Sequence, residues 1–141
     1  MKKKKKGLAI GNSDFKEIIQ ENGYYVDKTK FIEDLLEDLS KVKLFTRPRR
    51  FGKTLNMSML KYFFDVRNAE ENRKLFDNLY ISKSEYMENQ GQNPVILISL
   101  RNAEAENWED SFFNIKNLIS SLYDNFEYIS SNLKKIDLVE F

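Results

Sequence analysis

The stretch KLFTRPRRFGKT, residues 43–54, decides how the fold of this sequence is interpreted. It ends in Gly-Lys-Thr, the last three residues of the phosphate-binding loop pattern GxxxxGK(S/T). In such a loop, backbone N–H groups at a helix N-terminus surround the phosphates, the lysine reaches the β and γ oxygens, and the hydroxyl binds Mg²⁺. Arg47, however, stands in place of the first Gly, and Pro48 lacks an N–H donor. The stretch is therefore a nucleotide site, a basic nucleic-acid patch or a solvated surface turn.

Length and composition indicate one folded domain. The chain has 141 residues, of which 41% are hydrophobic and 13% aromatic, enough to bury a core. It has no Cys and no His. Thiol catalysis, disulfides, the usual zinc sites and histidine acid–base chemistry are therefore excluded.

The charge is balanced overall but unevenly distributed, with 23 basic and 22 acidic residues. Five of the lysines form the run 2–6, and without them 18 basic residues face 22 acidic ones, a net charge of −4. We expect residues 1–13 to be a disordered basic tail, and a folded body of negative charge does not favour nucleic acid as a partner. No apolar run is long enough for a secretory signal or a membrane span, so a cytoplasmic protein without a membrane partner is predicted.

The spacing of apolar residues predicts helices after Asp14, from about 30 to 39 with Asp27 or Thr29 as cap, and from Lys53 onward. Further helices are expected at 75–80, briefly near Tyr86, at 108–123 and in the tail. KVKLFT (41–46) and PVILISL (94–100) are read as strands, the second covered on both faces. This order predicts an α/β domain with helices around a parallel sheet, and because two strands are too few, the later strands are expected to be missing.

Charge favours the nucleotide interpretation of the loop. Three arginines and Lys53 lie within seven residues, where like charges repel and a helix N-terminus disfavours cations. An anionic ligand would offset both costs. The alternative is a solvated basic turn, in which neither the repulsion nor the unfavourable helix position of the cations is offset.

Together these segments resemble the AAA-ATPase-like family of prokaryotic P-loop NTPases. The resemblance is carried by RPRRFGKT, by YYVDKTKFI (24–32) before it, and by MLKYFF (59–64), KLFDNLYI (74–81) and PVILISL after it. It covers the chain from about Ile10 to about Leu122, and the family's own loop begins with Arg. It implies that residues 14–141 are the N-terminal part of an AAA-like P-loop ATPase domain. It also implies ATP and Mg²⁺ as cofactors and, often, a C-terminal nuclease-like domain in the full-length protein.

The resemblance assigns roles to residues of the loop. Lys53 corresponds to the phosphate lysine and Thr54 to the Mg²⁺ ligand, while Gly52 permits close approach of the backbone. The remaining cofactor-binding positions supply charge or N–H donors: Arg49, Arg50 and Phe51. The family's VDKT motif matches Asp27, Lys28 and Thr29 and implies a place near the nucleotide base, although a helix cap needs the same residue types. Tyr24 and Tyr25 either pack in the core or stack on the base.

The acidic Walker B strand of the family is absent from this sequence. Ser99 stands where PVILISL would need an Asp, and Arg101 follows it. The chain is therefore expected to be a fragment that binds ATP without being hydrolytically competent alone. The alternatives are a degenerate P-loop scaffold, or a nucleic-acid-binding module that uses the basic loop and the lysine tail.

Overall fold

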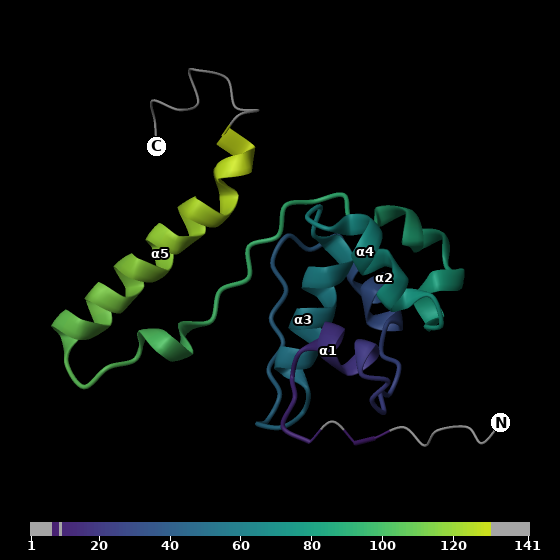
Figure 1. Ribbon diagram of the computed structural model, residues 1–141, viewed down its shortest axis with the longest axis horizontal. Coiled ribbons are helices and arrows are strands. Elements are labelled where there is room, and N and C mark those ends of the chain that lie inside the picture. Colours follow the sequence, from purple (N-terminus) through teal and green to yellow (C-terminus); the bar gives the residue numbers. More distant parts are fainter. Residues whose placement is uncertain (1–6, 9, 131–141) are drawn as a thin grey trace. The chain divides into compact units, whose positions relative to one another are not determined.

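The computed structural model describes residues 7–8 and 10–130, and the chain divides into two compact units, Met1–Leu97 and Ile98–Phe141. The first unit contains four α-helices followed by 3₁₀ turns (Figure 1). In order they are α1 (Phe15–Gln20), α2 (Lys30–Glu37), α3 (Lys53–Phe64), α4 (Ala69–Arg73), η1 (Lys74–Phe76), η2 (Tyr80–Lys83) and η3 (Glu85–Asn89). The second unit consists of η4 (Leu100–Ala103) and the long helix α5 (Trp108–Ser130).

Local sequence signals explain where α1 begins and ends. The Asp14 side chain accepts a hydrogen bond from the Glu17 N–H at 3.1 Å and so caps the first turn. Asn22 takes a positive φ of 55°, a conformation that Asn adopts more readily than most residues. The prediction of this helix is confirmed.

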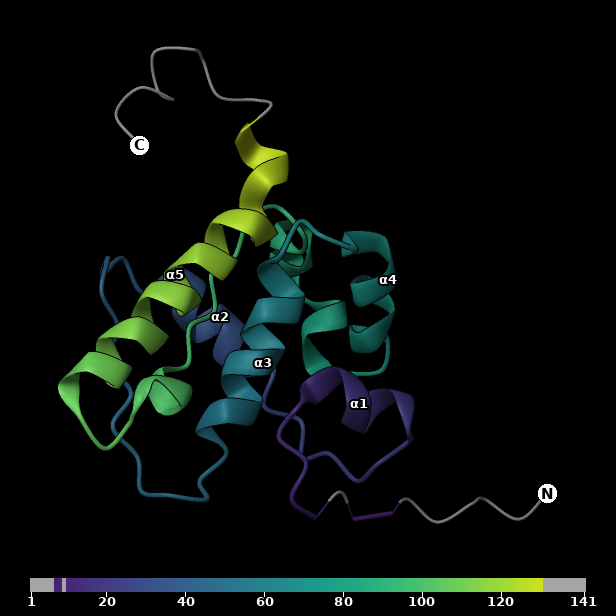
Figure 2. The same cartoon turned by 60° about the vertical axis from the view of Figure 1, so that its left-hand side comes forward.

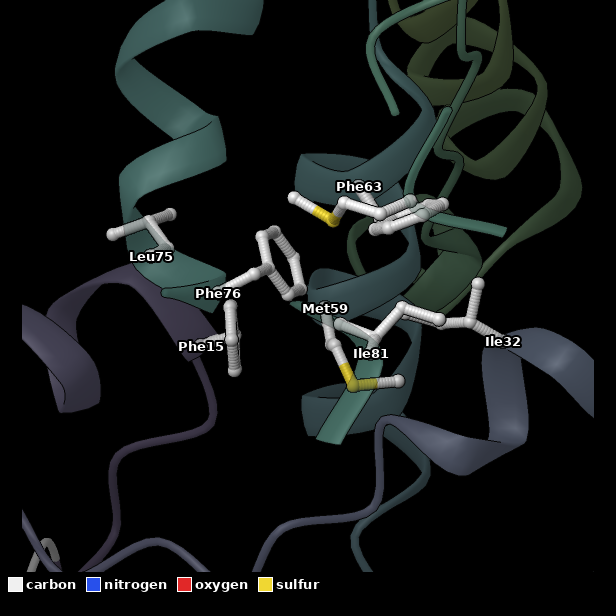
Figure 3. Close-up of a cluster of buried hydrophobic side chains, with 8 residues drawn as sticks. Phe15, Ile32, Met59, Phe63, Leu75, Phe76 and Ile81 are labelled. Atoms are coloured by element: carbon white, nitrogen blue, oxygen red, sulfur yellow. The ribbon is translucent and has the colours of Figure 1, made fainter. Parts of the chain in front are cut away.

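The core of the first unit gathers around the buried face of α3. Met59 and Phe63 of α3 are fully buried, and Figure 3 shows them facing side chains from α1, α2, η1 and η2. The Phe76 ring stacks on Phe15, with centroids 5.1 Å apart, and meets Phe63 edge-on. Each such fully buried side chain contributes about 1.5–3 kcal/mol relative to an exposed one. The apolar spacing that predicts this helix therefore also marks the face that it buries.

A group of side-chain hydrogen bonds joins α1 to α3, and the two helices lie side by side in Figures 1 and 2. The Ser58 hydroxyl accepts a hydrogen bond from the Phe15 N–H at 3.0 Å and donates one to the Asp14 carboxylate at 3.1 Å. Tyr62 donates to the same carboxylate oxygen, also at 3.1 Å. The residue that caps α1 therefore also positions it on α3.

The C-terminal end of α3 is closed by a distant segment of backbone. Gly91 and Asn93 donate hydrogen bonds to the carbonyls of Phe63 and Phe64, at 2.8 and 2.9 Å. These carbonyls would otherwise lack helical partners. Gly91 has a φ of +70°, and a Cβ there would lie 2.4 Å from the Ala69 Cβ. Only glycine fits this closure.

The prediction of a parallel sheet is wrong. Over the described residues there is no strand, and the paired extended residues amount to two isolated bridges, Gly7–Gly23 and Asp65–Asn93. The segments read as strands are irregular and extended, and Val42 and Leu44 of KVKLFT are 86% and 85% exposed. An apolar β-branched run favours extended backbone, but a strand exists only when a second segment supplies ladder hydrogen bonds. The α/β fold class, and with it the P-loop α/β fold, is therefore corrected to a helical one.

Several predicted helices exist with different lengths. The helix at 75–80 is divided, because Leu79 adopts an extended conformation between η1 and η2. The second helix ends at Glu37, so Leu39 lies beyond it and is 96% exposed. The helix that starts at Trp108 continues past Tyr123 to Ser130, and the rest of the tail, like the lysine run, lies outside the described residues.

Candidate functional site

The basic loop turns sharply into α3. Arg50 and Gly52 both have left-handed backbone conformations, with φ of 69° and 72°. For a residue other than glycine this conformation costs roughly 1–2 kcal/mol, so the backbone of Arg50 adopts it at the expense of local stability. Gly52 directly precedes α3 as its N-cap residue, and within residues 7–8 and 10–130 no side-chain hydrogen bond caps the helix. This N-terminus therefore has donors and a positive dipole end without a side-chain cap.

The cations of the loop lie at this helix end. Arg47, Arg49, Arg50 and Lys53 are all exposed. The Lys53 ammonium donates hydrogen bonds to the backbone carbonyls of Arg47 and, at 3.2 Å, of Pro48, so it folds back across the loop. Among the residues that the structure describes, none of these four cations forms an ion pair with a carboxylate. Four positive charges thus lie close in sequence at this helix end, and no carboxylate of the described residues neutralises them.

Two hollows flank the loop. The first, called the tyrosine hollow, has a volume of about 500 Å³ and is mostly apolar, with Ile10, Tyr24, Tyr25, Val26 and Leu55 among its lining residues and Arg50 and Gly52 at its loop side. The second, called the lysine hollow, has about 860 Å³ and combines apolar side chains with charged ones, including Phe31, Leu35, Met57, Asp34, Lys43 and Lys53. Four residues line both hollows: Lys28, Arg47, Phe51 and Asn56.

The VDKT segment has two different functions in the structure. The Asp27 carboxylate accepts hydrogen bonds from the N–H and hydroxyl of Thr29, at 2.9 and 2.7 Å, and from the Tyr80 N–H at 2.7 Å. Thr29 is fully buried and precedes α2 as its N-cap residue, although its side chain makes no capping bond. Asp27 and Thr29 thus join α2 to η2. Lys28, in contrast, is exposed and lines both hollows.

The structure brings together part of the predicted site. Lys28, Arg50, Phe51, Gly52 and Lys53 line one or both hollows, whereas Asp27 and Thr29 line neither. Arg49 and Thr54 are exposed on the loop and the first turn of α3, outside the two linings.

Asn56 is a lining residue that the sequence interpretation missed. It is half-buried, and its N–H donates to the Gly52 carbonyl at 2.9 Å. The helical period supplied a signal, because Asn56 lies three residues after Lys53 and so shares its side of α3.

The residues present fit a polyphosphate better than they fit a bare metal ion. Unpaired cations and uncapped N–H groups suit a multiply charged anion. Within the described part of the chain, no group of three or more Asp and Glu side chains is arranged to hold a metal ion. Asp34 and Asp38 line the lysine hollow, and Thr54 supplies a hydroxyl at the helix start.

The loop thus places exposed basic residues next to the start of α3, between two hollows. The chain belongs to the AAA-ATPase-like family, since the family model described as "Predicted AAA-ATPase" matches residues 9–140. Membership supports an ATPase-like function in coarse terms, with nucleotide and metal use in general. Neither the comparison with curated proteins nor that with solved structures gives a match. In residues 7–8 and 10–130, no helix is both long and apolar enough to cross a membrane.

Proposed function

We propose that this chain binds ATP together with Mg²⁺, and that residues 47–54 form the phosphate-binding loop. The proposal rests on one observation: four cations, none with a carboxylate partner among the described residues, gather at the N-terminus of α3, which has no side-chain cap there. Membership of the family of predicted AAA-ATPases supports the choice of ATP as the anion. The proposal concerns binding. The nuclease-like domain and the cytoplasmic location remain predictions.

Binding requires a rearrangement of Lys53. Its ammonium would leave the carbonyls of Arg47 and Pro48 for the β and γ oxygens, which are stronger acceptors because they are charged. Arg49 and Arg50 would add positive charge. The N–H groups of residues 49–54 would donate to the phosphates as they do at other helix N-termini. Mg²⁺, when bound, neutralises phosphate charge, and the Thr54 hydroxyl is the group of this loop that would hold it.

The tyrosine hollow is proposed to take the nucleotide base. Its volume of about 500 Å³ lies within the usual range of ligand pockets, and its apolar lining suits a flat aromatic ring. Tyr24 is 58% exposed and free to stack, whereas the Tyr25 ring packs edge-on against Phe15. Asp27 and Thr29 are engaged by backbone groups, which favours Tyr24 and Val26 over them as neighbours of the base.

Isothermal titration with Mg-ATP tests this function. We expect a dissociation constant in the micromolar to millimolar range, roughly −4 to −8 kcal/mol. Lys53→Ala should weaken binding about ten- to a hundred-fold, since a charge-assisted contact contributes roughly 1.5–3 kcal/mol. Lys41→Ala removes the same charge from an exposed position that lines neither hollow, and it should have little effect. Equal losses in both variants would show bulk attraction and refute the loop proposal.

Magnesium gives a second test. Thr54→Ala should leave Mg-free ATP binding unchanged and should reduce the additional affinity that Mg²⁺ provides, because the hydroxyl acts through the metal. A Thr54→Ala variant with the full magnesium effect would remove Thr54 from the proposed site.

The exposed arginines also support a second candidate, a nucleic-acid-binding surface. Such binding releases counterions and falls steeply between low and moderate salt. If oligonucleotide binding is strong at low salt and ATP does not compete with it, the nucleic-acid function is favoured over the nucleotide one.

A further inference from the structure

We infer that Lys28 is a phosphate-contacting cation that sets the preference of this site for nucleotides over nucleosides. Asp27 and Thr29 act as its positioning residues. The inference rests on the proposed function and adds to it a role for Lys28 distinct from that of a neighbour of the base.

The position of Lys28 gives the first argument. It lies at the boundary between the two hollows, together with Arg47, Phe51 and Asn56. Tyr24 lines the first hollow and Lys53 the second. A ligand with its base beside Tyr24 and its terminal phosphate at Lys53 has to cross this boundary. The ribose and the start of the phosphate chain connect these two ends, so Lys28 is placed where the negative charge of the ligand begins.

The rigidity of the surrounding backbone gives the second argument. On one side, Asp27 is held by the N–H groups of Thr29 and Tyr80. On the other, fully buried Thr29 accepts from the Ile81 N–H at 3.1 Å. The Lys28 carbonyl itself accepts from the Phe31 N–H at 3.0 Å. Since its backbone is fixed on both sides, the Lys28 side chain starts from a defined point beside the two hollows, which favours a preorganised site.

The third argument is electrostatic. Over the part of the chain that the structure describes, the Lys28 ammonium has no carboxylate partner. The carboxylate next to it in sequence, Asp27, is already occupied by two N–H groups and a hydroxyl. Lys28 also shares its boundary with a second basic residue, Arg47. Two like charges at one boundary repel each other, and a polyanion between them turns this repulsion into attraction.

Titration of Lys28→Ala with three ligands tests the inference. We expect the affinity for ATP and for tripolyphosphate to fall by about ten-fold, the usual effect of losing one charge-assisted contact, and the affinity for adenosine to stay unchanged. Lys30→Ala is the matched control, because Lys30 is an exposed lysine two residues away that lines neither hollow. Lys28→Arg should keep most of the ATP affinity.

Other outcomes overturn the inference. Equal losses for ATP and adenosine would make Lys28 a neighbour of the base, and equal losses in Lys28→Ala and Lys30→Ala would reduce its role to bulk charge. A loss in Lys53→Ala with none in Lys28→Ala would refute the inference and leave the proposed function standing. No loss in Lys53→Ala would refute the proposed function itself. Melting curves of each variant accompany the titrations, and should Lys28→Ala unfold, Lys28→Gln provides the same comparison.

Discussion

The hydroxyl of Thr29 accepts a hydrogen bond from the backbone N–H of Ile81 at 3.1 Å, although 52 residues separate the two. Both residues are fully buried. A second hydrogen bond joins the same two segments, because the Asp27 carboxylate accepts from the Tyr80 N–H. The start of η2 is therefore fixed by the segment that precedes α2, and a motif expected at a ligand serves the fold as well.

Replacement of the Thr29 hydroxyl by a methyl group should destabilise the protein. Thr29→Val keeps the shape but leaves the buried Ile81 N–H without an acceptor, which costs about 1–3 kcal/mol. Thr29→Ser keeps the hydroxyl and should lose less. Urea unfolding of both variants measures the difference. If Thr29→Val unfolds at the same urea concentration as the unaltered chain, the hydrogen bond is not stabilising.

Gly91→Ala should be more damaging than the same change at Gly11. Both glycines have a positive φ, but a Cβ at Gly91 would lie 2.4 Å from that of Ala69, whereas a Cβ at Gly11 meets nothing within 4 Å. Both variants incur the backbone cost of roughly 1–2 kcal/mol, and Gly91→Ala adds overpacking of about 1–3 kcal/mol. Chemical denaturation measures both. Ala69→Gly should relieve part of the Gly91→Ala effect, and its failure to do so would exclude the steric explanation.

Stability should fall at high pH because of Tyr25. Burial of its side chain, assisted by the nearby charge of Asp27, raises the pKa of Tyr25 to about 12 from 10.0. The unfolded chain therefore loses the Tyr25 proton at a lower pH than the folded chain does. The contribution of neutral Tyr25 to the free energy of unfolding is complete below pH 10 and is lost as the pH rises from 10 to about 12. Thermal melts across this window should show a smaller decline for Tyr25→Phe than for the unaltered chain. Equal declines would contradict the assignment.

The chain should self-associate through its exposed extended segments. Val42 and Leu44 present apolar side chains on backbone that forms no ladder with any other described segment, and such segments invite pairing with another chain. Light scattering should show a mass that rises with concentration. Leu44→Lys should reduce this rise more than Ser40→Lys, which adds the same charge at an exposed polar position. A monomeric mass at every concentration would refute this prediction.

The helices could be predicted because their signals are local. Asp14 before Phe15 and Asn22 after Gln20 mark the bounds of α1 within a few residues, and Met59 and Phe63 mark the buried face of α3. Caps and period depend on neighbours three or four residues away, which the sequence displays directly.

The sheet and the boundary role of Lys28 could not be predicted in this way. A strand depends on a partner segment whose position no local pattern gives, so the apolar run at 94–100 predicts a strand that the structure does not form. Asp27 and Thr29 are engaged by Tyr80 and Ile81, about fifty residues later, whereas Lys28 is not. The sequence does not show these distant contacts. The loop motif predicted which residues carry charge, but the two hollows beside it follow from tertiary packing.

The closure of α3 by Gly91 and Asn93 also has a consequence for synthesis on the ribosome. The chain is made from its N-terminus, so Phe63 and Phe64 leave the exit tunnel well before the residues whose N–H groups complete their hydrogen bonds. Until residue 93 has emerged, the last turn of α3 has to keep these two carbonyls in water. The nascent chain therefore passes through an interval in which the end of α3 is not yet closed, and this interval ends when residues 91–93 bind.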